Sequence, residues 1–251
     1  MGSQAVVPTD EYYFDFDFAS GSSYPGSGTE IYDLSNNYTG SISGSLSYDG
    51  TTGYFTFTGN SANYLNVPYD SNMDYVGNVD SGLTMIMWAR NTDTAGVDGG
   101  VFRKGWWGVD SNNQANYAFG KGFSTNDRGS GEFNTNLTNG DNMICPTNEL
   151  WGPNLWRNVV VTMEYNATNN QTSGSLWLNN VSQSFFDNFP SGSGSIPGYA
   201  VANTNPLEIG KSRSTSTAWK GQIAVVKAYK GVWTSTEVND YWNNTKTRFG
   251  L

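Results

Sequence analysis

The chain ends with WKGQIAVVKAYKGVWTSTEVNDYWNNTKTRFGL, residues Trp219–Leu251, and this stretch decides the fold. Residues 221–229 are apolar at most positions, as expected of a strand that is buried in a sheet. A tight turn follows, and the apolar residues then change to helical spacing. The stretch predicts one buried strand, one turn and one short terminal helix.

A capping box marks the start of that helix. Thr234 and Glu237 have the required spacing, in which the Thr234 hydroxyl accepts a hydrogen bond from the Glu237 amide and the Glu237 side chain bonds back. Trp233 and Val238 flank this cap as a hydrophobic staple. The aromatic residues that follow are Tyr241 and Trp242 on the helix and Phe249 in the tail. We expect these rings to cover one end of a sheet.

Strand signals recur along the rest of the chain. In YYFDFDF (12–18), phenylalanines alternate with aspartates, so one face is apolar and the other polar. In GLTMIMWAR (82–90) both faces are apolar, which is typical of a central strand. The other predicted strands cover residues 53–59, 156–165, 174–181, 205–212 and 221–229. So many strands with a single helix predict an all-β fold, in which two antiparallel sheets pack face to face as a sandwich or jelly roll.

Charge and hydropathy exclude two classes of partner. The formal net charge is −9 and the pI about 4.4. An acidic surface repels phosphate backbones and anionic lipid headgroups, so we expect neither nucleic-acid binding nor membrane insertion. No stretch approaches the ~18 apolar residues of a spanning helix. The N-terminal residues have neither the basic start nor the apolar run of a signal peptide.

Strand signals continue from Tyr12 to Tyr229 without a dividing linker. We therefore expect residues 12–251 to form a single domain, preceded by residues 1–11 as an N-terminal arm or as residues added for expression. Cys145 is the single cysteine, so no internal disulfide forms. A core of this size is stable without one.

Six motifs follow one another in a fixed order. They are SYPGSGTEIYDLSNNYTGSISG (23–44), GYFTFTGNSANYLNVP (53–68), LTMIMWAR (83–90), WRNVVVT (156–162), NPLEIGKS (205–212) and the terminal stretch quoted above. Together they resemble the laminin G-like, concanavalin A-like lectin-glucanase jelly-roll domains, over about the whole chain. The tail from Asn243 to Gly250 is similar to such domains in virus and phage structural proteins. The resemblance implies the jelly-roll fold and leaves the function open, because this fold hosts lectins, glucanases, adhesion modules and virion surface proteins.

The sequence lacks the residues that catalysis on this fold requires. Glucanases of the family carry a strand E-x-D-x-x-E, whose carboxylates act as nucleophile and acid, and no such run occurs here. The absence of histidine excludes Ser-His-Asp and Cys-His chemistry and histidine-bound metals. Cys145 precedes Pro146 and is expected to be an inert thiol. We therefore expect no catalytic residue and no enzyme activity.

The resemblance also implies a structural Ca²⁺ near the loop that begins at residue 23, with Asp33 and Asn36 as its ligands. Calcium takes six to eight oxygen ligands. The late strand of the family often donates an acid through I-D-E-V, whereas this chain has Ile223-Ala224-Val225-Val226 and lacks that ligand. Asp33 has the alternative role of stabilising a turn through its side chain.

A sugar site needs aromatic rings for the C–H faces of the sugar and planar polar groups for its hydroxyls. RKGWWGVDSNNQANYAFGKGF (103–123) is the richest stretch of this kind. In a strand, neighbouring tryptophans point to opposite faces, so one of the pair is expected outside the core. The alternative is that both are packed, as is usual for tryptophan. The candidate ligand-binding residues are Trp106, Trp107, Asn112, Asn113 and Tyr117.

The sequence thus favours a non-catalytic adhesion module on a virion surface or in an extracellular setting. Its expected partner is a glycan or a glycoprotein receptor. Two alternatives remain: a capsid or fibre decoration protein that contacts other virion proteins or copies of itself as a homo-oligomer, and an unusual polysaccharide-active enzyme.

Overall fold

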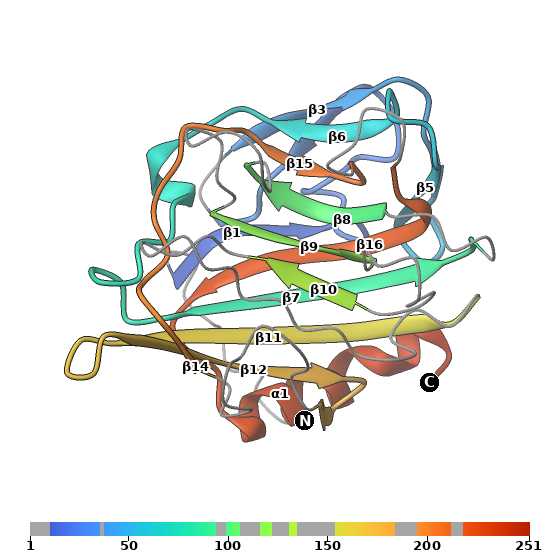
Figure 1. The fold of residues 1–251 in the computed structure, drawn as a ribbon. Helices are drawn as coiled ribbons and strands as arrows, with labels where there is room; N and C mark the ends of the chain where they lie inside the picture. Colours follow the sequence, from blue (N-terminus) through green and yellow to red (C-terminus); the bar gives the residue numbers. More distant parts are fainter. Residues whose placement is uncertain are drawn as a thin grey trace.

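The strands form two antiparallel sheets that pack face to face, as Figure 1 shows for the computed structural model. The structure describes residues 11–35, 38–93, 99–105, 116–121, 131–134, 154–183, 195–211 and 218–251. Within them, the two sheets enclose the main apolar core, and one short helix follows the last strand. The predicted β-sandwich with a C-terminal helix is confirmed.

The first sheet runs through β13 (Val181–Gln183), β12 (Gln171–Leu178), β11 (Trp156–Asn166), β7 (Leu83–Asn91), β16 (Lys220–Lys230), β5 (Tyr54–Thr58) and β4 (Ser47–Asp49). It also includes β1 (Tyr12–Asp17), which pairs with β16, and β14 (Ser195–Pro197), which pairs with β12. The second sheet runs through β10 (Gly131–Asn134), β9 (Tyr117–Lys121), β8 (Gly99–Lys104), β15 (Leu207–Ile209), β6 (Tyr64–Val67), β3 (Thr39–Ser43) and β2 (Glu30–Tyr32). The helical segments are η2 (Ser71–Met73), α1 (Ser235–Thr245) and η3 (Lys246–Phe249).

β16 is an interior strand of the first sheet, and both of its edges are paired. β7 pairs with one edge, whereas β5 and β1 share the other: β5 meets residues 220–223 and β1 meets residues 225–229. Gly221 is required in this strand, since a Cβ atom there would lie 2.0 Å from the carbonyl oxygen of Arg90 on β7. The strand predicted from the terminal stretch therefore joins three strands that are distant in the sequence.

The core follows the predicted alternation. On β1, Phe14 is fully buried between the sheets, whereas Asp15 forms an ion pair with Lys227 of β16. On β7 both faces are covered: Met85 lies in the main core and Ile86 in a cluster beneath the helix. The predictions of a one-sided strand at 12–18 and of a central strand at 82–90 are both confirmed.

One predicted strand is wrong in its extent. Residues 174–181 were expected to form one strand, but β12 ends at Leu178 and β13 begins at Val181. Asn179 and Asn180 form the turn between them, with φ angles of 49° and 66°. Two consecutive residues with positive φ are the requirement of a tight hairpin turn, and asparagine tolerates this conformation well.

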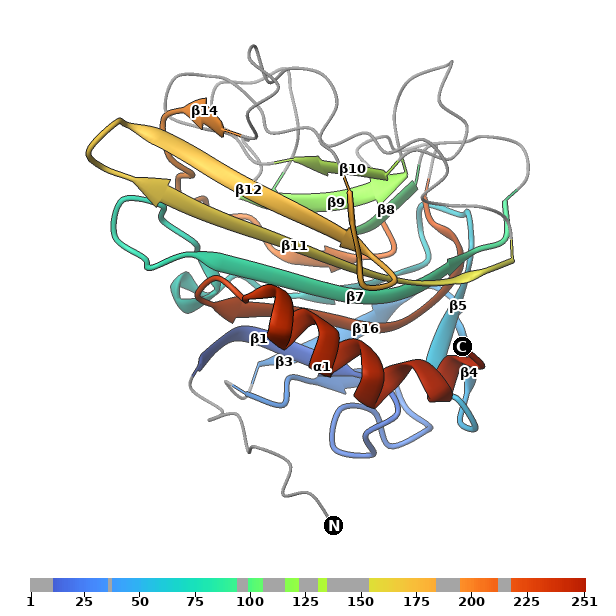
Figure 2. The same ribbon diagram turned by 90° about the horizontal axis from the view of Figure 1, so that it is seen from below.

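Helix α1 lies across the outer face of the first sheet, over β7 and β16 (Figure 2). The predicted capping box is present: the Glu237 amide donates to Thr234 Oγ1 at 3.3 Å, and the Thr234 amide donates to Glu237 Oε2 at 2.7 Å. Trp233 and Val238, the predicted staple pair, lie in one buried cluster with Ile86. The terminal stretch is ordered because its strand completes a sheet and its helix covers that sheet.

Candidate functional site

A row of polar side chains crosses the outer face of the second sheet. The strand register pairs Glu30 with Ser41, Ser41 with Asn66, Asn66 with Glu208, and Glu208 with Arg103. Cross-strand partners point to the same face of a sheet. The flanking positions are buried in the core, namely Ile31, Leu65, Val67, Phe102, Leu207 and Ile209. We call these five residues the polar row; at strand spacing they extend over about 19 Å.

Ion pairs hold the β8–β15 half of the polar row. Arg103 Nη2 lies 2.5 Å from Glu208 Oε2, and Lys211 Nζ lies 2.6 Å from Glu208 Oε1. The same Lys211 ammonium is 3.9 Å from the ring centroid of Tyr64, so it covers one face of that ring. The side chains of Arg103 and Glu208 are only 11% and 12% exposed. The charged groups in this half of the row are therefore held in place by their ion pairs.

The β2–β3 half of the face is open. Glu30, Thr39 and Ser41 are exposed, and the ring of Tyr32 is 36% exposed. The Tyr32 hydroxyl donates to Glu30 Oε2 at 2.6 Å, and this hydrogen bond raises the pKa of Tyr32. An aromatic ring held in place by its hydroxyl, beside a carboxylate and two hydroxyl groups, is a polar surface with one apolar platform.

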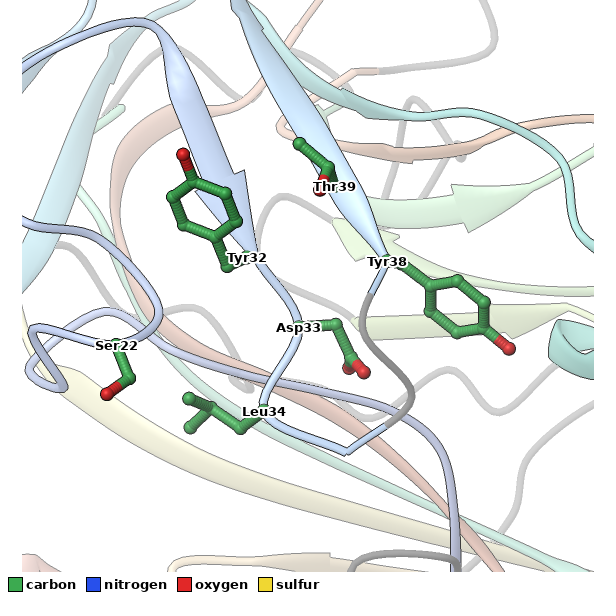
Figure 3. A pocket seen from close by; sticks show the side chains of 6 residues that line it. All are labelled: Ser22, Tyr32, Asp33, Leu34, Tyr38 and Thr39. Carbon is green, nitrogen blue, oxygen red and sulfur yellow. The ribbon is translucent and has the colours of Figure 1, made fainter.

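A pocket of about 450 Å³ opens at the end of the β2–β3 hairpin (Figure 3). Its lining consists of Ser22, Tyr32, Asp33, Leu34, Tyr38 and Thr39. Tyr32 and Tyr38 point in opposite directions from the hairpin. The pocket is therefore lined both by the exposed ring of Tyr32 and by the partly buried ring of Tyr38. Burial raises the pKa of Tyr38, whose hydroxyl is buried and has no hydrogen-bond partner within the described part of the chain. The pocket thus continues the polar face toward the interior.

Asp33, a predicted calcium ligand, ties the hairpin to the first sheet. Its carboxylate accepts hydrogen bonds from the Asp15 amide, from the Ser35 amide at 3.0 Å and from the Ser35 hydroxyl at 3.1 Å. Among the described residues, no group of three or more cysteine or acidic side chains is placed to hold a metal ion. The donors around Asp33 do not resemble the oxygen cage that calcium needs. Asn36 lies outside the described residues, so calcium binding stays a prediction.

The predicted glycan residues divide into two groups. Trp106, Trp107, Asn112 and Asn113 lie outside the described residues. Tyr117 is described and is fully buried: its ring packs in the main core and its hydroxyl donates to the Met73 carbonyl oxygen at 2.7 Å. Tyr117 therefore supports the core and does not present a ring to a ligand, because it is an inward-facing position at the start of β9.

Strands β8 and β9 flank the part of the sequence that contains Trp106, Trp107, Asn112 and Asn113. β8 ends at Lys104 and β9 begins at Tyr117, and these two residues are partners in the antiparallel register. The end of β8 and the start of β9 therefore lie side by side at one end of these strands. Arg103, the last member of the polar row, is the neighbour of Lys104, so the polar row connects this end with the β2–β3 pocket.

The polar row was missed in the sequence analysis, although its signal is present there. In three of the five strands the signal is a polar residue next to apolar residues of the core: EIY on β2, YLNV on β6 and PLEI before and within β15. Alternation identifies such a residue as outward-facing. Only the register shows that the outward residues of five strands are neighbours.

Comparisons with known proteins describe the fold. No family model matches the sequence, and no curated protein is similar to it. Trypanosoma rangeli sialidase in complex with sialic acid has a similar structure, with a TM-score of 0.62 at 13% identity over 95% of this chain and 33% of the sialidase chain. The receptor-binding domain of botulinum neurotoxin D matches with a TM-score of 0.63 at 10% identity, over 94% of this chain and 53% of that one.

The binding domain of Paraclostridial Mosquitocidal Protein 1 is similar to the same degree, with a TM-score of 0.62 and 14% identity over 94% of this chain and 52% of that one. This chain thus spans about a third of the sialidase chains and about half of the toxin chains. At these identities the likeness shows a β-sandwich fold alone. No helix within the described ranges is long and apolar enough to cross a membrane.

Proposed function

We propose that this chain is a non-catalytic surface module that binds a glycan along the polar row and in the β2–β3 pocket. The observation that carries the proposal is the row itself, which places carboxylate, hydroxyl, amide and guanidinium groups on neighbouring strands of one face. Sugar hydroxyl groups need such donors and acceptors, and the C–H face of a sugar ring needs an aromatic platform. Tyr32 supplies that platform at the open end.

The length and charge of the face define the ligand class. The row is about 19 Å long, and its more accessible part runs from Glu30 to Asn66, because the Arg103 and Glu208 side chains are only 11% and 12% exposed. The net charge of −9 disfavours a polyanionic glycan, and the exposed end carries Glu30. We therefore expect an extended neutral oligosaccharide, with Trp106, Trp107, Asn112 and Asn113 contributing from the connection beyond Lys104.

The setting of this activity is part of the proposal. The tail motif favours a virion or fibre surface, where a glycan or glycoprotein receptor is met outside a cell. Two structural neighbours are described as binding domains, which supports a binding role for this fold without naming a ligand. The acidic net charge and a sequence without the E-x-D-x-x-E run agree with attachment rather than turnover.

A glycan array with the purified chain tests the proposal. Binding to neutral oligosaccharides is expected, and Tyr32→Ala is expected to weaken it about tenfold, the equivalent of ~1.4 kcal/mol. Tyr32→Phe keeps the ring and should retain binding. Tyr165→Ala, in the β11–β12 hairpin of the other sheet, is the matched control and should bind as the wild type does. Trp106→Ala and Trp107→Ala test the predicted contribution of the connection.

Two outcomes would replace this function. A silent array together with a stable homo-oligomer in solution would favour a structural decoration protein that contacts only protein partners. Release of reducing ends from a polysaccharide panel would establish an enzyme. Binding that survives Tyr32→Ala and is lost in Tyr165→Ala would move the site to the other sheet.

A further inference from the structure

Lys104 is a buried lysine at the end of β8. Its partners in the strand register are Leu207 and Tyr117, which both belong to the main core, so its side chain points between the sheets and away from the polar row. The side chain is 0% exposed. Lysine is almost never fully buried unless it is paired, so a specific arrangement must hold it.

Two side chains hold the Lys104 ammonium group. Asp74 Oδ1 forms an ion pair and a hydrogen bond with Nζ. Asn203 accepts two further hydrogen bonds from Nζ, at its backbone oxygen (2.8 Å) and at its side-chain Oδ1 (3.2 Å). In return, Asn203 Nδ2 donates to the Lys104 carbonyl oxygen at 3.1 Å. The side-chain amide of Asn203 is therefore bound to Lys104 through both its oxygen and its nitrogen.

Two tyrosine rings lie next to this cluster, the exposed Tyr69 and the buried Tyr117. The Tyr69 ring centroid lies 4.9 Å from Lys104 Nζ, and the fully buried Tyr117 is the register partner of Lys104. The Asp74 side chain is only 7% exposed. Burial lowers the pKa of the Lys104 amine, an effect that Asp74 opposes. A neutral lysine amine is a nucleophile, whereas the ammonium ion is not.

We propose that Lys104 and Asn203 react to form an intramolecular isopeptide bond, with Asp74 as the proton carrier. The Asp74 carboxylate takes one proton from the Lys104 ammonium, and the neutral Nζ attacks Cγ of Asn203. The Nζ–Cγ bond forms. Asp74 then returns this proton to Nδ2, and the Cγ–Nδ2 bond breaks. The departing ammonia takes up the second proton that Nζ loses, so that it leaves as ammonium. The net change is ammonium plus carboxamide to secondary amide plus ammonium, which consumes no oxidant, metal or cofactor.

The starting geometry is close to what this reaction needs. Nζ lies 3.2 Å from Asn203 Oδ1, and a C=O bond is about 1.2 Å long, so Cγ is within about 4.4 Å of Nζ. Reacting atoms in a near-attack arrangement are about 3–3.5 Å apart. A shift of Nζ by about 1 Å toward Cγ brings the two atoms into that range. The hydrogen bonds of Asn203 keep its side-chain amide in place.

The bond would tie two distant parts of the second sheet together. It joins the end of β8 to the segment that precedes β15, at positions 99 residues apart. A crosslink of this kind restricts the unfolded chain, as a disulfide does, but it is not reversed by reduction. It also fixes the strand end from which residues 105–116 depart, beside Arg103 of the polar row.

Intact mass spectrometry of the denatured full chain tests this inference. The wild type is expected about 17 Da lighter than its sequence mass, because ammonia is lost. A protease digest should contain a branched peptide that joins the segments around Lys104 and Asn203. A wild-type chain of full sequence mass, with both residues recovered in linear peptides, would overturn the proposal and leave an ordinary buried ion pair.

Variants separate this loss of ammonia from other reactions of asparagine. Lys104→Arg and Asp74→Asn should restore the full mass, whereas Lys211→Arg, the matched lysine control, should keep the loss. Asn203→Asp still offers a carboxyl carbon, so it should lose about 18 Da as water and yield the same branched peptide, which also shows that the chain has folded. A loss of about 17 Da that persists in Lys104→Arg would place the reaction at another asparagine and contradict the proposal.

Discussion

The phenyl ring of Phe249 stacks on the indole of Trp88, with the ring centroids 4.0 Å apart and the ring planes 17° from parallel. Trp242 of α1 stacks on the same indole at 5.5 Å. Trp88 faces outward from the centre of β7, so the last residues of the chain cover what would otherwise be a large exposed aromatic surface. The terminal tail is therefore part of the folding unit.

Replacing this ring tests its contribution. Phe249→Ala is expected to lower the free energy of unfolding by about 3 kcal/mol, because it removes buried contacts and leaves a cavity against Trp88. Urea denaturation followed by tryptophan fluorescence measures the change. Leu251→Ala, at a 48% exposed position two residues away, should change stability by less than about 0.5 kcal/mol. Equal losses of unfolding free energy in the two variants would contradict a specific contribution of the contact between Phe249 and Trp88.

The capping box gives a smaller, local prediction. Thr234→Ala removes the acceptor of the Glu237 amide and is expected to cost about 1 kcal/mol. Thermal melting of the variant should show this loss while the native far-ultraviolet spectrum is retained. Ser235→Ala alters the neighbouring exposed hydroxyl and serves as the control. An unchanged melting temperature in Thr234→Ala would mean that packing of the staple alone fixes the helix start.

Buried tyrosines predict alkaline sensitivity. Burial raises the pKa of Tyr12, Tyr13 and Tyr75. These groups stay protonated in the folded chain at pH values where the unfolded chain has lost the protons, so the unfolded state binds fewer protons. Stability is therefore retained below pH ~10 and falls above it, by up to about 1.4 kcal/mol per pH unit for each such tyrosine.

Urea unfolding at pH 7, 9, 10 and 11 measures this dependence. Tyr13→Phe removes one titrating group, so its stability should decline less steeply than that of the wild type above pH ~10. The variant at pH 7 provides the reference for any loss of packing. Parallel curves for the two proteins between pH 9 and 11 would contradict the assignment for Tyr13.

Asp33 allows the structural and metal roles to be separated. Asp33→Ala leaves the amides of Asp15 and Ser35 without their acceptor and is expected to cost about 2 kcal/mol. This loss should be the same in calcium and in EDTA, since it arises from hydrogen bonds within the chain. Asp33→Asn keeps one acceptor oxygen and should recover part of the stability.

The predicted calcium site would give a different result. Calcium bound only to the folded chain would raise the melting temperature of the wild type, and EDTA would remove that gain. Differential scanning calorimetry in three separate buffers, with calcium, magnesium or EDTA at about 1 mM, distinguishes the two cases. A stability difference between wild type and Asp33→Ala that appears only with calcium would assign Asp33 to the metal.

The sequence alone determined several elements of this fold, but not all of its strands. Alternation in YYFDFDF predicted a strand with one apolar face, the two-sided apolar pattern of LTMIMWAR predicted a central strand, and the Thr234–Glu237 spacing predicted the helix start. These features were accessible because side-chain periodicity and capping depend on residues that are close in the chain. The hairpin at Asn179–Asn180 was missed because the strand predicted over 174–181 includes the two asparagines, which end the apolar run 176–178.

Only the tertiary structure decided which polar residues become neighbours. The polar row takes one residue from each of five strands, and the Lys104 cluster brings together residues 74, 104 and 203. Their proximity depends on strand order and register, which are set by contacts between distant segments, and a shift of one residue would turn every side chain of a strand to the other face. A single sequence specifies which face each residue takes, whereas the partners across that face follow from how the two sheets assemble.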